Sequence, residues 1–228
     1  MINILFPHKR YSFISESFLQ NFPQEIINRF DENKSVIKLT KGQVLFHEGA
    51  IPTGVYILKS GKVKKYCTGL NGKEHIFHLI KENGLFGHHN LLCEETYSHS
   101  TACLTDCVFH LIPKDVFIST VENNREMLHC LLKIISHEFG VFSNNSRILA
   151  QHNVRERTAL SIIKLEEFFN ENGNIRLSRK DHSNIVGTSI ESLVRVLHDF
   201  KEEKLIEIKE NIIKIIDIKR LANITNFI

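Results

Sequence analysis

The chain has 228 residues, with 29 Lys and Arg against 26 Asp and Glu, and a formal net charge of +3. Its 42% hydrophobic and 24% charged residues are typical of a globular protein and exclude fibrous and disordered classes. No apolar stretch approaches the roughly 20 residues that span a bilayer. Residues Met1–Tyr11 lack the apolar core of a signal peptide, so export is not expected. Five irregularly placed cysteines do not resemble a disulfide framework and fit the cytoplasm.

The segment from Val36 to Phe117 is predicted to be an all-β region, within an N-terminal domain of residues 1–122. Short apolar and β-branched runs alternate with glycines, as where Val55–Leu58 leads to Gly61. Asn71-Gly72 separates two alternating runs, which is a strong β-hairpin signal. Strands at this spacing favour a sandwich or jelly-roll barrel over a βαβ sheet.

Residues 123–151 are predicted to form one long helix without proline. An apolar residue recurs at spacings of four and three over roughly three to four heptads. These residues are Leu128, Leu132, Ile135, Phe139, Phe142 and Leu149. Such a narrow stripe packs either on the protein's own barrel or on the same helix of a second copy. Its position between two domains favours a dimerisation seam.

Residues 152–228 are predicted to form a small module of helices with a β-hairpin. One helix runs to Phe169, and Ser178 and Asp181 have the spacing of a capping pair at the start of the next helix. That helix ends at Gly187, and Thr188 with Glu191 repeats the capping spacing for a third helix. A hairpin turning at residues 210–211 follows. Two helices joined by a tight turn and followed by a hairpin indicate a winged helix-turn-helix.

Residues 175–217 resemble the winged helix-turn-helix of Crp/Fnr-family transcription regulators. Upstream, Lys41–Gly49, Tyr56–Gly61 and Gly84–Gly87 resemble the cyclic-nucleotide-type sensor barrel of that family. The resemblance implies an α+β fold: a jelly-roll barrel, a long dimerisation helix and a winged helix-turn-helix. It further implies a cytoplasmic homodimer that binds a two-fold-symmetric double-stranded DNA site, contacts RNA polymerase and regulates transcription as an activator or a repressor.

The third helix of the module is the predicted DNA-reading element. Glu191 and Arg195 are four residues apart and therefore share its exposed face. Arginine donates two hydrogen bonds to guanine, and glutamate accepts one from cytosine. The alternative is a solvated ion pair worth a few tenths of a kcal/mol. Further DNA contacts, to bases or phosphates, are assigned to Arg179, Lys180, Thr188, Ser189, Ile190 and Ser192.

Ile190 indicates which half-site is read. In the Crp branch this position resembles a second arginine that reads another guanine. Here it is apolar, as in the Fnr-like branch, and can touch a thymine methyl group. The sequence therefore predicts TTGAT-type rather than TGTGA-type half-sites, although Val194 replaces the small polar residue usual in Fnr-like proteins.

The signal that the barrel senses is not identified by the sequence. The resemblance places the effector pocket at Phe86, Gly87, His88, His89, Tyr97 and Ser98. The glutamate and arginine that hold cAMP in the family are missing there, so cAMP is not expected. No cysteine precedes Cys67, which argues against an Fnr-type iron–sulfur cluster. Haem ligation by a barrel histidine stays open, no metal site is assigned, and an unknown small-molecule effector is expected.

Two alternatives remain at this point. A cupin-like metal-binding barrel also contains histidines, but His75 and His78 have the wrong spacing for its metal motif. A regulator that binds DNA without any effector is the other alternative. The sequence contains no nucleophile elbow, phosphate-binding glycine loop or paired-carboxylate motif, so an enzyme is not expected.

Overall fold

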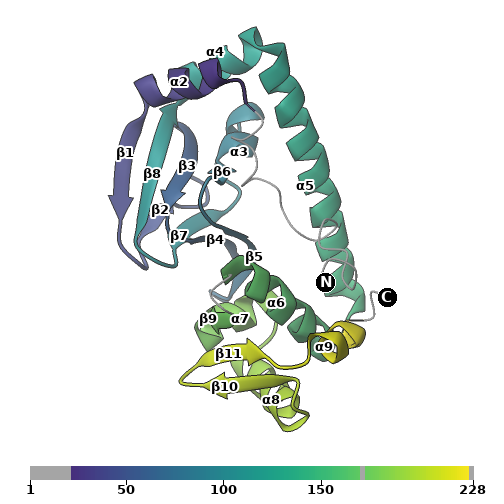
Figure 1. Cartoon of the computed structure of the whole chain (residues 1–228). Helices are drawn as coiled ribbons and strands as arrows, with labels where there is room; N and C mark the ends of the chain where they lie inside the picture. Colours follow the sequence, from purple (N-terminus) through teal and green to yellow (C-terminus); the bar gives the residue numbers. More distant parts are fainter. Residues whose placement is uncertain (1–21, 170–172, 226–228) are drawn as a thin grey trace. The chain divides into compact units, whose positions relative to one another are not determined.

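The computed structural model describes residues 22–169 and 173–225, so Met1–Tyr11 lies outside the described residues. The chain divides into two compact units, which meet between Gly140 and Val141 within one long helix (Figure 1). Among the described residues, no helix is both long enough and apolar enough to cross a membrane.

The first unit contains two four-stranded sheets whose paired strands are all antiparallel. One sheet has the order β1-β8-β3-β6 and the other has the order β2-β7-β4-β5. The strands are β1 (Ser35–Leu39), β2 (Val44–Phe46), β3 (Gly54–Ser60), β4 (Val63–Thr68), β5 (Glu74–Ile80), β6 (Leu85–Phe86), β7 (Ser100–Cys103) and β8 (Cys107–Pro113). This is the predicted all-β architecture.

The hairpin expected at Asn71-Gly72 joins β4 to β5. Val63 pairs with Ile80 and Thr68 with Glu74, and Gly72 has a φ of 71° in the turn. Glycine adopts this left-handed conformation without the steric penalty of a Cβ atom. The hairpin prediction is therefore confirmed.

The predicted strand region extends too far at its end. Strand β8 stops at Pro113, and α4 (Lys114–Asn123) follows at once, so Phe117 belongs to a helix. Phe117 is fully buried and its ring stacks on Phe30 of α2 (Gln24–Asn33) at 6.2 Å between centroids. The four-residue spacing of Phe117 and Val121 fits a helix, because both side chains then face the same core.

The long helix α5 (Arg125–Gln151) carries two parallel stripes of side chains. One stripe, Met127, Leu131 and Ile134, is buried in the core of the first unit. The predicted seam lies beside it: Leu128, Leu132, Phe139, Phe142 and Leu149 are exposed, and Ile135 is half-buried. The predicted seam is therefore not the stripe that packs on the barrel, and its pairing with a second copy stays a prediction.

The second unit is built from helices around a three-stranded sheet of order β10-β11-β9. Its elements are α6 (Val154–Phe169), β9 (Asn174–Arg176), α7 (Arg179–Val186), α8 (Ile190–Glu202), β10 (Ile206–Lys209), β11 (Ile212–Ile215) and α9 (Ile218–Ile224). Glu210 and Asn211 both have positive φ, as a two-residue hairpin turn requires. The predicted wing is confirmed, whereas β9 and α9 are additional elements.

Candidate nucleic-acid interface

The turn between α7 and α8 forms as the sequence predicts. The Ser178 hydroxyl accepts a hydrogen bond from the backbone N–H of Asp181 and caps the start of α7. Gly187 ends that helix with φ 71° and ψ 45°, and its N–H donates to the Ser183 carbonyl at 2.9 Å. A left-handed glycine at this point stops the helix and lets the chain turn directly into α8.

The cap of α8 lies one residue later than predicted. Ser189, and not Thr188, is the N-cap: its hydroxyl accepts from the backbone N–H of Ser192 at 3.1 Å. Thr188 is buried. Both side chains can cap a helix, and the capping-box spacing of Thr188 with Glu191 favoured the wrong one.

The outer face of α8 presents a mixed set of groups to solvent. Ile190 and Val194 are 42% and 46% exposed, and Glu191 and Arg195 are exposed beside them. The opposite face is buried through Leu193, Leu197 and Phe200. Four adjacent exposed side chains of two apolar and two charged kinds can meet methyl groups, donors and acceptors of base edges.

The Glu191 carboxylate is prepared to act as an acceptor. Hydrogen bonds from its own backbone N–H and from the Ser189 side chain lower the pKa of Glu191 below its ordinary value. A carboxylate in the first turn is also favoured by the positive end of the helix dipole. Glu191 is therefore ionised at neutral pH and can accept from a cytosine amino group.

The remaining predicted contact residues differ in accessibility. Lys180 and Ser189 are exposed, and Ser192 is half-buried. Arg179 is half-buried, and burial lowers its pKa. Its Nη1 atom is buried without a hydrogen-bond partner among the described residues. The side chain of Arg179 is therefore less available to a phosphate than that of Lys180.

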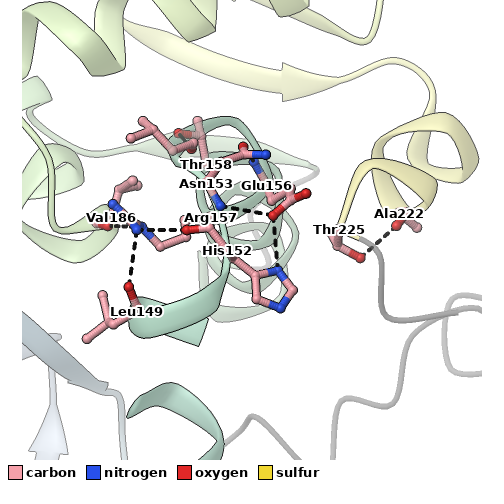
Figure 2. Close-up of polar contacts among 10 residues, drawn as sticks. Leu149, His152, Asn153, Glu156, Arg157, Thr158, Val186, Ala222 and Thr225 are labelled. Atoms are coloured by element: carbon pink, nitrogen blue, oxygen red, sulfur yellow. Dashed lines mark hydrogen bonds and ion pairs between the residues drawn. The ribbon is translucent and has the colours of Figure 1, made fainter. Parts of the chain in front are cut away.

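Arg157 of α6 joins the end of α5 to the helix-turn-helix (Figure 2). Its Nε donates to the Val186 carbonyl at 3.0 Å, and Nη2 donates to Gly187 at 3.3 Å. Its Nη1 donates to the carbonyls of His152 at 2.9 Å and Leu149 at 3.4 Å. One guanidinium thus satisfies carbonyls at the C-terminal ends of two helices, where the backbone has no partners of its own.

A reciprocal capping pair fixes the start of α6 at the same place. The Asn153 side chain accepts from the Glu156 N–H at 3.0 Å, and the Glu156 carboxylate accepts from the Asn153 N–H at 2.9 Å. The Asn-x-x-Glu spacing is a readable signal for this cap. No comparable signal exists for Arg157, because its partners come from separate parts of the chain.

The predicted effector pocket is partly filled by aromatic rings. Phe86, His88 and Tyr97 are buried, His89 is half-buried and Ser98 is exposed. Tyr97 stacks on Phe46 at 3.8 Å between ring centroids. Phe86 stacks on Tyr56 at 5.8 Å. The structure therefore brings most of these predicted residues together but leaves Ser98 at the surface.

A jelly-roll barrel, a long helix with an exposed apolar stripe and a winged helix-turn-helix define a two-part DNA-binding regulator. The cyclic nucleotide-binding domain family matches residues 36–124, and the Crp-like helix-turn-helix domain family matches residues 156–224. The chain belongs to the Crp/Fnr family of transcriptional regulators. The cupin-like alternative is not supported, because a cupin barrel does not carry this second domain.

Two bacterial transcription regulators match the chain at similar levels. It is 24% identical over 192 residues to the CRP-like cAMP-activated global transcriptional regulator of Mycobacterium tuberculosis, covering 82% of this chain and 86% of that one. It is 26% identical over 212 residues to the fumarate and nitrate reduction regulatory protein of Vibrio cholerae, covering 90% and 81%.

Solved structures show the same fold. FixK2 of Bradyrhizobium japonicum superposes with a TM-score of 0.76 at 17% identity, covering 84% of this chain and 96% of that chain. The c-di-GMP responsive regulator CLP of Xanthomonas campestris gives a TM-score of 0.74 at 18% identity, covering 85% and 99%. These likenesses show the fold alone.

Proposed function

We propose that the chain is a cytoplasmic homodimeric transcription regulator that reads TTGAT-type half-sites through α8 and responds to a signal other than cAMP. The observation that carries this proposal is the outer face of α8, where Glu191 and Arg195 are exposed between the exposed apolar side chains of Ile190 and Val194. Arg195 would read guanine, and Glu191 would read the cytosine of an opposite strand.

The exposed stripe of α5 supports the homodimer. Leu132 and Phe139 are 55% and 76% exposed, which is an unusual position for large apolar side chains on a helix. The stripe repeats with heptad spacing, the pattern of helices that pair with a second copy. A dimer would present two copies of α8 to half-sites about one DNA turn apart, roughly 34 Å.

The barrel supports a signal other than cAMP. In the family, a glutamate and an arginine hold the nucleotide; here His88 takes the place of the glutamate, and Tyr97-Ser98 stands at the arginine position. Aromatic rings stack on one another in the core instead. A cyclic phosphate there would lack a charge-assisted partner of the usual kind. RNA polymerase remains the expected protein partner, by family membership.

Selection from random DNA on the purified full-length protein tests the half-site. We expect TTGAT-type half-sites in inverted repeat, and recovery of TGTGA-type half-sites would contradict the proposal. Arg195→Ala should weaken binding by about 1–3 kcal/mol per half-site and relax the preference at the guanine. Lys219→Ala is the matched control, since it removes an exposed positive charge of α9 outside α8.

Calorimetric titration with cAMP tests the signal separately. We expect no heat of binding and no change in DNA affinity when cAMP is added. Saturable cAMP binding that tightens the protein–DNA complex would contradict the proposed signal. It would not bear on the proposed TTGAT-type half-site.

A further inference from the structure

The buried stripe of α5 contains a charged residue. Met127, Leu131, Ile134 and Glu138 follow one another at spacings of four, three and four, so Glu138 occupies the next position of a core-facing stripe. Its side chain is almost entirely buried, with 2% of the residue exposed. An ionised carboxylate in such a place is costly unless positive groups or a metal ion balance it.

Two histidines of the short helix α3 (His88–Leu92) face this carboxylate. The His89 Nε2 atom lies 2.8 Å from the Glu138 Oε2 atom, and the His88 Nε2 atom lies 4.0 Å from it. The two imidazole rings are adjacent, with 4.1 Å between centroids. Leu91 of the same helix packs in one core with Leu131 and Ile134 of α5, so the two helices are held side by side.

We propose that His88, His89 and Glu138 bind one divalent transition-metal ion of the zinc class inside the barrel unit. One ligand atom from each residue lies within 4.8 Å of the others. Ligands of a tetrahedral zinc ion are about 3.3 Å apart, so a small inward movement of the three side chains would complete the contacts. The proposal is independent of the half-site proposed above.

The donor set identifies the class of metal. Two imidazole nitrogens and one carboxylate oxygen are ligands typical of zinc and of neighbouring metals such as cobalt and nickel, whereas calcium and magnesium prefer oxygen. Three protein ligands leave one position of a tetrahedron open, as in zinc sites that bind water or a small molecule. The site therefore differs from a closed structural zinc site.

A second charged side chain, that of Lys65, is buried near Glu138. Lys65 of β4 is 3% exposed, and burial lowers its pKa to about 8, while the nearby Glu138 charge acts in the opposite direction. A bound metal ion and the Lys65 ammonium carry like charges near one carboxylate and would repel each other. Removal of the Lys65 charge should therefore strengthen metal binding. If the site bound an anion instead, the same substitution would remove a positive group that attracts the anion and would weaken binding.

The sequence did not predict this site because the three residues come from two distant segments. The spacing of the histidines in the sequence does not link them to Glu138. Only the packing of α3 against α5 brings Glu138 to them.

The test uses the full-length, untagged protein, dialysed against a chelator and then loaded with Zn²⁺ or Co²⁺. We expect one ion per chain, measured by elemental analysis after dialysis, and visible d–d absorption bands from bound Co²⁺. His89→Ala and Glu138→Gln should each weaken zinc binding by more than about tenfold, measured by competition with a chromophoric chelator. His89→Ala is the safer variant for folding, because that side chain is half-exposed.

Two further variants make the result specific. His47→Ala removes an exposed barrel histidine outside the group and should leave zinc affinity unchanged. Lys65→Met should leave zinc affinity equal or tighter. The proposal is overturned if the wild-type protein retains no zinc, if His89→Ala and Glu138→Gln retain as much as wild type, or if Lys65→Met abolishes binding in a folded protein.

Discussion

The outer face of α8 and the interior of the barrel place polar groups in opposite situations. On α8, the side chains of Glu191 and Arg195 are exposed to solvent. In the barrel, Lys65, His88 and Glu138 are buried among apolar side chains. Exposed groups are available to a partner at little cost in stability, whereas buried groups must be balanced within the fold. Substitutions of exposed residues should therefore change binding, and substitutions of buried residues should change stability.

The largest effect on binding is expected from the exposed seam of α5. Leu132→Asp combined with Phe139→Asp would place charges in the proposed dimer interface, leaving the buried stripe intact. We expect a monomer in analytical ultracentrifugation and DNA affinity reduced by at least about 100-fold, because the two half-sites no longer act together. Lys133→Asp, at an exposed position beside the seam, is the control and should remain a dimer. A double variant that is still dimeric would refute the seam.

A buried histidine of the second unit should govern acid stability. His182 is fully buried, its Nε2 atom lies 2.8 Å from the Ser161 hydroxyl, and burial lowers its pKa to about 3, with Arg179 a smaller cause. The unfolded chain binds a proton near pH 6.5 and the folded chain does not. The free energy of unfolding should thus be highest above pH 6.5 and fall below it by about 1.4 kcal/mol per pH unit down to pH 3.

Denaturation of His182→Gln and wild type between pH 7 and pH 4 measures this contribution. In the variant, the free energy of unfolding should fall less steeply with decreasing pH than in wild type, by the slope that corresponds to one proton. His198→Gln is the matched control, since the His198 side chain is 69% exposed, and it should not alter the slope. Equal slopes for all three proteins would show that His182 does not act as described.

The next largest effect is a loss of stability on substitution of Arg157, whose guanidinium is used in hydrogen bonds within the fold. Arg157→Met keeps much of the side-chain stem and leaves the carbonyls of His152, Val186 and Gly187 without this donor. We expect the free energy of unfolding of the second unit to fall by about 2–3 kcal/mol, measured by chemical denaturation. Hydrogen exchange should be faster at the end of α7. Arg176→Met, at an exposed arginine of β9, should change neither quantity.

The smallest expected effect, Ile190→Arg, should alter specificity without altering stability. The position is exposed at the start of α8, and an arginine there could donate to another guanine. We expect preference to move toward TGTGA-type sites by about 1–2 kcal/mol, measured as the ratio of affinities for the two duplexes. Val194→Arg adds the same charge on the same face and should not produce this exchange.

Local features of the second unit could be predicted from the sequence, because capping pairs, a helix-ending glycine and a two-residue turn act over a few positions. The spacing of apolar residues also predicted the stripe that is exposed on α5, and its pairing with a second copy stays a prediction. The cap at Ser189 was missed by one residue because threonine and serine are both good caps. The signal for α2 was present in the helical spacing of Ile26 and Phe30, both buried.

Contacts between distant segments could not be predicted in this way. The hydrogen bonds of Arg157 to two helix ends and the contact of Glu138 with α3 depend on tertiary packing. A glutamate among the apolar residues of α5 resembles a solvated position until the fold shows which face it occupies. Periodicity locates a stripe but does not say what covers it.

Glu138 and Phe139 are neighbours in α5, one buried and the other 76% exposed. Consecutive residues of an α-helix are separated by about 100° around its axis, since a turn holds 3.6 residues. Any turning of this helix that draws the Glu138 carboxylate toward the imidazoles of α3 must swing Phe139 through the same angle. If zinc binding turned α5 in this way, the exposed side chain of Phe139 in the proposed dimerisation seam would turn with it.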